Sequence, residues 1–203
     1  MPSIYDLKPG FQSLLKPLVK ALHAHGVTAN QVTLTAVALS FMGGGMIAWK
    51  PGEAWPLLVL PLVLLVRMGL NAIDGMLARD FAQQSKLGAM LNELGDVISD
   101  AALYLPLAWL PMVYPPLVVG FVILSILSEM TGVVAVQIGA RRQYQGPMGK
   151  SDRAFWLGAM AFALGVGVAP GNWLNWLFGV MLIMLLITIT NRVRTALKET
   201  HAA

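Results

Sequence analysis

The chain has 203 residues, of which 57% are hydrophobic and only 12% are charged, and its mean hydropathy is +0.68. Because soluble domains carry roughly 25% charged residues, this composition excludes a soluble globular domain and a disordered chain, and it predicts an all-α integral membrane protein. The sequence contains no cysteine, which excludes disulfides and thiolate chemistry. It also lacks a dense basic stripe, which argues against a nucleic-acid partner.

Six apolar segments of about the length needed to cross a bilayer follow one another along the chain. They cover residues 30–49, 54–79, 86–110, 113–138, 154–170 and 173–192. The fifth segment is short and rich in glycine. No linker is long enough to separate two domains, so residues 1–203 are expected to form one six-span helical bundle.

Residues 10–24, before the first span, have a different pattern. Apolar side chains recur there at helical spacing, at Phe11, Leu14, Leu15, Leu18 and Leu22. Because Lys16 and Lys20 lie elsewhere around the helix, the segment is predicted to be an amphipathic helix on the membrane surface. The alternative is a helix that packs against the protein. Pro17 is expected to break or kink it.

Lysine and arginine residues are concentrated in the loops on one side of the six segments. They precede the first segment, separate the second from the third and the fourth from the fifth, and follow the sixth. The opposite loops contain only Lys50. Because these residues are enriched in cytoplasmic loops, both termini and the charged loops are expected to face the cytoplasm.

Polar side chains cluster where the second and third spans approach the short loop between them. Asn71 and Asp74 are three residues apart and share a helix face with Arg67, one turn earlier. Asn92 and Asp96 are four residues apart and form a second polar stripe. Because a short loop makes the two helices antiparallel neighbours, the stripes can face each other. Their oxygen atoms suit Mg²⁺ or Mn²⁺, ions that also bind phosphate.

Glycine and arginine residues beside this cluster favour a ligand that contains phosphate. Gly75 and Gly88 have no side chain, so a phosphate or nucleotide can approach the backbone, and Arg79 can bind phosphate through two parallel hydrogen bonds. The alternative is that small residues serve helix packing and Arg79 marks the membrane interface. The occurrence of the whole set within 30 residues favours a ligand site.

The same residues form a motif with fixed spacing. The chain reads Asn71-x2-Asp74-Gly75-x2-Ala78-Arg79, then eight residues, then Gly88-x3-Asn92-x3-Asp96. This resembles the motif of the CDP-alcohol phosphotransferases, which is Asp-x2-Asp-Gly-x2-Ala-Arg followed by Gly-x3-Asp-x3-Asp. A second feature of that family is matched before the first span by Asn30-Gln-Val-Thr33, and the resemblance covers nearly the whole chain.

The resemblance implies an activity, a cofactor and a set of site residues. Family members displace CMP from a CDP-linked lipid with an alcohol in a metal-dependent reaction, so Mg²⁺ or Mn²⁺ is the expected cofactor. The metal positions of the family fall here on Asn71, Asp74, Asn92 and Asp96, and Asp96 corresponds to its proposed catalytic base. The donor-binding positions fall on Ala29, Asn30, Gln31, Val32, Gly75, Ala78, Arg79, Ser85 and Gly88.

Three functions stay open at this point. The first is transfer of a phosphatidyl group from CDP-diacylglycerol to a small alcohol in phospholipid biosynthesis, with a soluble CDP-alcohol as the alternative donor. The second is a non-catalytic CDP-lipid- or nucleotide-binding relative, and the third is a small transporter. The resemblance also implies a homodimer in the bacterial inner membrane, with Gly43, Gly44 and Gly45 as a close-packing point between chains or within one.

Two positions depart from the family motif. Its first and third aspartates are replaced by Asn71 and Asn92, so only Asp74 and Asp96 keep a negative charge. An amide oxygen can bind a metal ion, but it is neutral. We therefore predict a single divalent ion, with Arg67 supplying part of the missing positive charge. The alternative is that Arg67 extends to lipid phosphates.

Further charged residues lie outside the motif. Asp100 and Glu93 are candidates to compensate for the missing carboxylates, and Glu129, inside the fourth span, either lines a cavity or bonds to another helix. A basic loop between the fourth and fifth spans contains Arg141, Arg142, Lys150 and Arg153. The candidates to bind an acceptor or lipid phosphate are Arg67, Arg141, Lys150 and Arg153. The alternative is that the loop only marks the topology.

Overall fold

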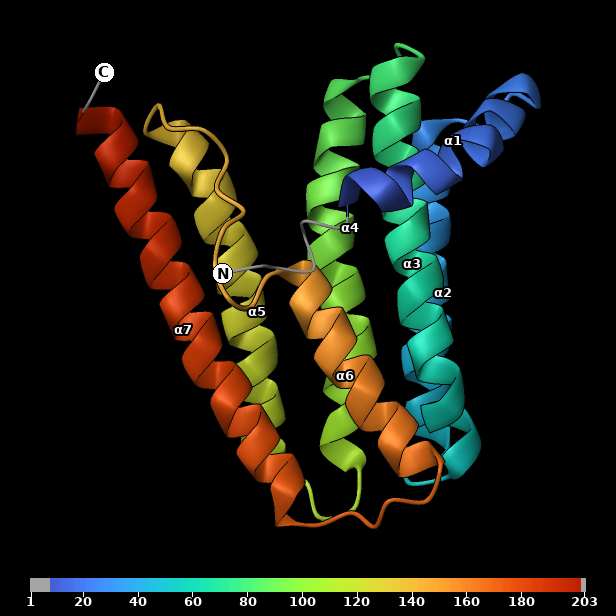
Figure 1. Cartoon of the computed structure of the whole chain (residues 1–203), viewed down its shortest axis with the longest axis vertical. Helices are drawn as coiled ribbons and strands as arrows, with labels where there is room; N and C mark the ends of the chain where they lie inside the picture. Colours follow the sequence, from blue (N-terminus) through green and yellow to red (C-terminus); the bar gives the residue numbers. More distant parts are fainter. Residues whose placement is uncertain (1–7, 202–203) are drawn as a thin grey trace.

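The computed structural model describes residues 8–201, and every element in this part of the chain is a helix, which confirms the all-α prediction (Figure 1). In chain order the elements are α1 (Lys8–Ala24), α2 (Ala29–Trp49), α3 (Ala54–Asp80), α4 (Lys86–Tyr104), the 3₁₀ helix η2 (Leu105–Trp109), α5 (Pro115–Gln137), α6 (Lys150–Gly165) and α7 (Asn172–His201). Figure 1 shows α2 to α7 running roughly along the long axis, whereas α1 crosses the ends of α2 and α3.

Four helices, α2, α3, α5 and α7, are long and apolar enough to cross a membrane. Helix α4 has 19 residues and α6 has 16, and both contain charged side chains that belong to the predicted site or loop. That α4 and α6 also cross the membrane therefore stays a prediction.

The expected third span, 86–110, is divided into α4 and η2. Pro106 lies in the first turn of η2 and has no N–H to donate to the carbonyl of Ala102, so the α-helical pattern cannot continue there. The expected fifth span, 154–170, is displaced: α6 begins at Lys150 and ends at Gly165. The first difference shortens the helix that carries Asp96, and the second places Lys150 and Arg153 in a helix.

Helix α2 packs against both α3 and α4, and its glycines make this possible. A Cβ atom at Gly43 would lie 2.9 Å from side chains of α3 and α4, and one at Gly44 would collide with the carbonyl of Ala102. A Cβ at Gly45 would have no neighbour within 4 Å among the described residues. Gly43 and Gly44 therefore serve packing within one chain, and the homodimer stays a prediction.

Helix α1 runs through Pro17 without a break, so of the two expected outcomes only a kink stays a prediction. One face packs on α3: Val19 is buried and belongs to a cluster with Ile73, Met76 and Leu77. On another face Leu14 is 78% exposed. The structure therefore shows the helix packed against the protein, and its place on the membrane surface stays a prediction.

The starts of α2 and α4 are fixed by side-chain caps. At α2 the hydroxyl of Thr28 accepts from the backbone N–H of Gln31, whose side chain accepts from the N–H of Thr28. At α4 the hydroxyl of Ser85 accepts from the N–H of Gly88 at 2.9 Å. The N–H of Ala29 donates to Gln83 in the α3–α4 loop at 2.7 Å, so the two helix starts are held together.

Candidate active site

Helices α3 and α4 both pack against α2. The contacts between α3 and α4 themselves are made by polar side chains. The amide of Asn71 in α3 donates to Oδ1 of Asp96 in α4 at 3.1 Å. Arg67, one turn earlier in α3, donates to the backbone carbonyl of Asp96 at 3.1 Å. The two predicted polar stripes therefore do face each other.

Asp74 is buried beside α2. The hydroxyl of Thr33 donates to its Oδ2 at 2.7 Å, and the whole residue is only 4% exposed. Its other oxygen, Oδ1, has no hydrogen-bond partner in the part of the chain that the structure describes. Burial of an anionic oxygen without a partner is unfavourable, so Oδ1 is suited to a cation or a hydrogen-bond-donating ligand. The sequence assigned no role to Thr33 beyond the resemblance of its segment.

Asp96 is more open than Asp74, with 21% of its side chain exposed. Asn71 donates to its Oδ1, and the Lys150 ammonium forms an ion pair with the same atom. Across residues 8–201, no hydrogen bond is directed to Oδ2 of Asp96. One oxygen is therefore held by the protein, and the other is available to a metal ion or to a proton.

Arg79 lies over Gly75. The guanidinium Nη1 is 3.2 Å from the position that a Cβ atom would take at Gly75. Arg79 is exposed at the end of α3, whereas Gly75 is half-buried one turn earlier. The absence of a side chain at Gly75 therefore gives the guanidinium and any bound phosphate access to the backbone.

A second glycine brings α2 and α4 together. A Cβ atom at Gly88 would lie 2.8 Å from Oδ1 of Asn30 and 3.0 Å from the hydroxyl oxygen of Ser85. The predicted donor-binding residues Asn30, Ser85 and Gly88 are thus neighbours. Ala29 and Val32 are buried and belong to the packing cluster under α1. The side chain of Gln31 takes part in the α2 cap, and Ala78 is half-buried in α3.

The oxygen atoms of the motif are of the kind that divalent cations bind. Oδ1 of Asp74 and Oδ2 of Asp96 are anionic, and the amide carbonyls of Asn71 and Asn92 supply neutral oxygens. No side-chain hydrogen bond engages Asn92 within the described residues. No cluster of three or more Asp, Glu, His or Cys side chains suited to a metal ion occurs in that same part of the chain. The negative charge available to an ion is therefore that of two carboxylates.

Asp100 lies one turn beyond Asp96 and is enclosed by arginines. Nη1 of Arg67 is 2.6 Å from its Oδ1, and Nη2 of Arg153 donates to its Oδ2 at 2.8 Å. All three residues are buried. Asp100 is therefore the counter-ion of two guanidinium groups and is not a free metal ligand.

Glu129 in α5 continues this network. Its Oε1 accepts from Arg153 at 3.1 Å and lies 3.6 Å from Nη1 of Arg192, and its Oε2 lies 3.6 Å from Arg142. Arg192 also donates to the carbonyl oxygens of Tyr144 and Gln145 at 3.2 Å each. Of the two roles considered for Glu129, the structure favours bonding between helices, because its carboxylate joins α5, α6, α7 and the loop before α6.

Arg142 connects the basic loop to α4 by an ion pair with Glu93. Burial lowers the pKa of the Arg142 guanidinium from its ordinary value, and the neighbouring Tyr144 acts in the opposite direction. The guanidinium still carries its charge near neutral pH. Glu93 is therefore engaged by an arginine, as Asp100 is.

The structure separates the four cations of the basic loop. Arg141 is exposed, and its backbone N–H donates to Glu199 at 2.9 Å. Arg142 and Arg153 belong to the ion-pair network. Among the described residues of this loop, Lys150 alone contacts a carboxylate of the metal motif. The sequence did not reveal the network; the signal it did carry was Glu129, a carboxylate within an apolar span.

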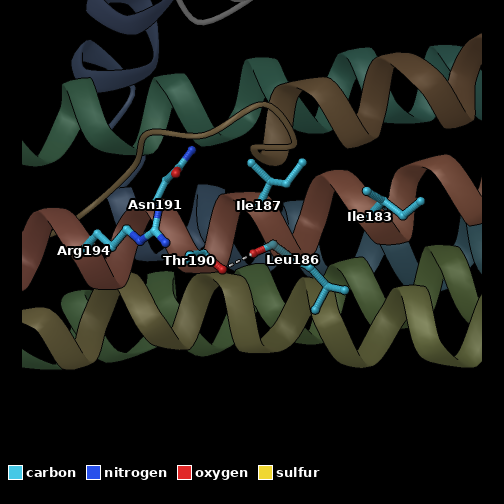
Figure 2. A pocket seen from close by; sticks show the side chains of 6 residues that line it. All are labelled: Ile183, Leu186, Ile187, Thr190, Asn191 and Arg194. Atoms are coloured by element: carbon cyan, nitrogen blue, oxygen red, sulfur yellow. Dashed lines mark hydrogen bonds between the residues drawn. The ribbon is translucent and has the colours of Figure 1, made fainter.

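A groove of about 260 Å³ lies along α7 (Figure 2). It is lined by Ile183, Leu186, Ile187, Thr190, Asn191 and Arg194. The hydroxyl of Thr190 donates to the carbonyl of Leu186 at 2.8 Å, within the helix. None of the predicted site residues lines this groove, so it is distinct from the candidate active site.

Known proteins of similar sequence match nearly the whole chain. The model of the CDP-alcohol phosphatidyltransferase family matches residues 26–195. Inner membrane protein YnbA of Escherichia coli is 46% identical over 195 residues, which is 96% of this chain and 96% of that protein. The phosphatidylinositol phosphate synthase of Mycolicibacterium smegmatis is 25% identical over 207 residues, covering 100% of this chain and 89% of that protein.

Solved structures of the phosphatidylinositol phosphate synthase of Mycobacterium tuberculosis share the fold. The structure with CDP-DAG bound has a TM-score of 0.73 at 22% identity and covers 89% of this chain and 92% of its own. The structure in complex with manganese and citrate has a TM-score of 0.72 at 22% identity and covers 89% and 87%. From the family match and the matched motif, the chain belongs to the CDP-alcohol phosphatidyltransferase family.

Proposed function

We propose that this chain is a membrane enzyme that transfers the phosphatidyl group of CDP-diacylglycerol to a small alcohol, phosphorylated or not, and releases CMP. The observation that carries the proposal is the pair of carboxylate oxygens without protein partners in the described structure, Oδ1 of Asp74 and Oδ2 of Asp96, in the motif that ends at Arg79 and Asp96. A fold neighbour with CDP-DAG bound supports the choice of donor.

The donor would be held by residues of three helices. Arg79, at the end of α3, would bind a phosphate of the nucleotide through its planar guanidinium, with the backbone of Gly75 next to it. Asn30 at the start of α2 and Ser85 before α4 present polar atoms beside Gly88. This arrangement binds a phosphate and a polar nucleotide while the apolar helices remain in contact with lipid.

Asp74 and Asp96 would hold a divalent ion, with help from the amide oxygens of Asn71 and Asn92. When bound, Mg²⁺ or Mn²⁺ would neutralise charge on the pyrophosphate and on the departing CMP. The manganese in a fold neighbour supports this cofactor class. The burial of Asp74 would exclude water from one side of the ion.

Asp96 would act as the base. Oδ2 carries two lone pairs: one would face the ion, and the other would accept the proton of the acceptor hydroxyl while the hydroxyl oxygen forms a bond to phosphorus and the bond from phosphorus to the CMP oxygen breaks. Asn71 and Lys150, both on Oδ1, fix the orientation of the carboxylate. An oriented base is required because misplacement of a reacting group lowers the rate sharply.

The proposal is tested by incubating the full chain with CDP-diacylglycerol, a panel of alcohols and alcohol phosphates, and Mg²⁺ or Mn²⁺. CMP release and a new phospholipid, both abolished by a chelator, are the expected result. A parallel assay with a soluble CDP-alcohol and a lipid acceptor distinguishes the donor class. Absence of CMP release with every acceptor in the panel and both donor classes would contradict the proposal.

A second candidate is a CDP-lipid-binding protein without catalysis. It is favoured by the amide of Asn71, which acts as a hydrogen-bond donor to Asp96 where a carboxylate would bind a cation. This candidate predicts saturable binding of CDP-diacylglycerol without CMP release. Measuring binding by calorimetry beside the activity assay separates the two functions.

The cellular setting is proposed on similar grounds. A cytoplasmic active site in the bacterial inner membrane follows from the charged loops and is supported by the 46% identical inner membrane protein. A homodimer is proposed from the family alone. Native mass measurement in detergent is expected to give the mass of two chains, and a monomer at high protein concentration would contradict the dimer.

A further inference from the structure

The cation closest to the metal motif is part of the protein. The Lys150 ammonium is ion-paired with Oδ1 of Asp96, the same atom that accepts from Asn71. The Lys150 side chain is 22% exposed and that of Asp96 is 21% exposed, so the pair is only partly buried. One of the two remaining motif carboxylates is therefore neutralised without any metal.

The position of Lys150 is fixed by the ion-pair network. Lys150 is the first residue of α6, and the N–H of the preceding Gly149 donates to Asp152 at 3.0 Å. Arg153, one turn into α6, is fully buried and is bound to Asp100 and Glu129. The start of α6 is thus anchored to α4 and α5, and the anchored helix directs the ammonium to Asp96.

Arg67 lies farther from the Asp96 carboxylate than Lys150 does, and its predicted share of the missing positive charge stays a prediction. Its Nη1 is 2.6 Å from Asp100, whereas its Nη2 is 4.0 Å from Oδ1 of Asp96. The closest charge partner of Arg67 is therefore Asp100. The cation that is ion-paired with Asp96 at the shorter distance is Lys150, 83 residues further along the chain.

The charges of the ion-pair network and the two motif aspartates balance before any ligand binds. Five cations, Arg67, Arg142, Lys150, Arg153 and Arg192, accompany five carboxylates, Asp74, Glu93, Asp96, Asp100 and Glu129. Arg79, where a donor phosphate would bind, adds one more positive charge, and a CDP-linked lipid brings two negative charges, one on each phosphate. One divalent ion would then leave a net charge of +1, whereas a second would leave +3 in a region of low dielectric constant.

We propose that Lys150 is a built-in cation of the metal site, which limits the chain to one divalent ion, bound through Asp74 and the free oxygen of Asp96. This assignment deepens the proposed function and rests on it for the role of the site. It makes Lys150 a positioning residue that acts on the ion and on Asp96.

The test is a titration of the purified full chain with Mn²⁺ in detergent, with free Mn²⁺ read by electron paramagnetic resonance and no donor present. We expect one Mn²⁺ per chain. Lys150→Met removes the neighbouring positive charge and is expected to lower the Mn²⁺ Kd by about tenfold or more. Lys150→Arg keeps the charge and is expected to retain the Kd of the unmodified chain.

Lys198→Met is the matched control, because Lys198 is exposed on α7 and contacts no carboxylate of the motif in the described structure. Two Mn²⁺ per chain, or none, in the unmodified protein overturns the proposal even if a variant fails to fold. An unchanged Kd in folded Lys150→Met also overturns it. CMP release by a chain that binds two ions would leave the proposed function standing. One bound ion without CMP release would remove the function and keep the cation assignment.

Discussion

Asp96 and Asp100 are one turn apart on α4, yet their surroundings are opposite. Asp100 is buried between Arg67 and Arg153, with a guanidinium at each of its oxygens. Asp96 has Lys150 and Asn71 on one oxygen and, within residues 8–201, no hydrogen bond to the other. A carboxylate that is enclosed by cations holds helices together, whereas one with a free oxygen is available for chemistry.

The same contrast extends to the residues around each aspartate. We call Asp100, Glu129, Arg67, Arg153 and Arg192 the paired region and Asp74, Asp96, Asn71 and Asn92 the open region. Removal of one partner from a buried ion pair is strongly destabilising, because the other charge is left without compensation. The open region has the reverse property, since a buried carboxylate oxygen without a partner gains from a ligand. Mutations in the two regions should therefore affect different measurements.

The largest effect is expected from Asp96→Asn. Loss of the base should reduce CMP release by roughly 10²–10⁴-fold, because general-base catalysis typically contributes that factor. The substitution also removes a carboxylate from the metal site and the partner of Lys150, so Mn²⁺ binding is expected to weaken, whereas the contact of Arg79 with Gly75 stays in place. Asp80→Asn, at the exposed end of α3, is the matched control. Near-normal turnover by folded Asp96→Asn would show that the open oxygen of Asp96 is not the base.

Glu129→Gln should break the paired region. Three arginines, Arg142, Arg153 and Arg192, lose a carboxylate partner. We expect a loss of about 3–5 kcal/mol in the free energy of unfolding, as for other broken buried ion pairs. Thermal unfolding in one detergent, compared with exposed Glu53→Gln, measures the effect. If both variants unfold at the same midpoint, the network does not stabilise the bundle.

Asp74→Asn is the converse change. It removes a buried charge with one unpaired oxygen, and the hydroxyl of Thr33 can still donate to the new amide oxygen. The unfolding midpoint without metal should stay the same or rise. Mn²⁺ binding should weaken by more than the roughly 10–100-fold that loss of an outer partner costs. Stabilisation by Mn²⁺ in the variant equal to that in the unmodified chain would place the metal elsewhere.

The open region was predictable because it depends on local periodicity. Residues three or four apart share a helix face, and a short loop between α3 and α4 limits their arrangement, so Asn71 and Asp96 were expected to approach each other. The approach of Arg79 to Gly75 is equally local, since the two residues are one turn apart. The spacing of the motif therefore indicates which of these residues lie close together.

The paired region was not predictable in this way. Arg192 follows an apolar span, a position typical of a topology signal, but it is buried beside Glu129, 63 residues away. Which cation meets which carboxylate depends on the neighbours and rotation of α5, α6 and α7, which a single sequence does not specify. The third span is shortened because Pro106 has no N–H to donate, and this property of proline is visible in the sequence.

Arg79→Lys is expected to have the smallest effect and tests how far the open region extends. The variant keeps the charge beside Gly75 but loses the planar pair of donors, so affinity for CDP-diacylglycerol should fall by about tenfold. Stability and Mn²⁺ binding should be unchanged, because Arg79 is exposed and is outside the ion-pair network in the described structure. Arg194→Lys, also exposed, controls for the exchange itself. Equal calorimetric affinities for the two variants would confine the open region to Asp74, Asp96 and their immediate partners.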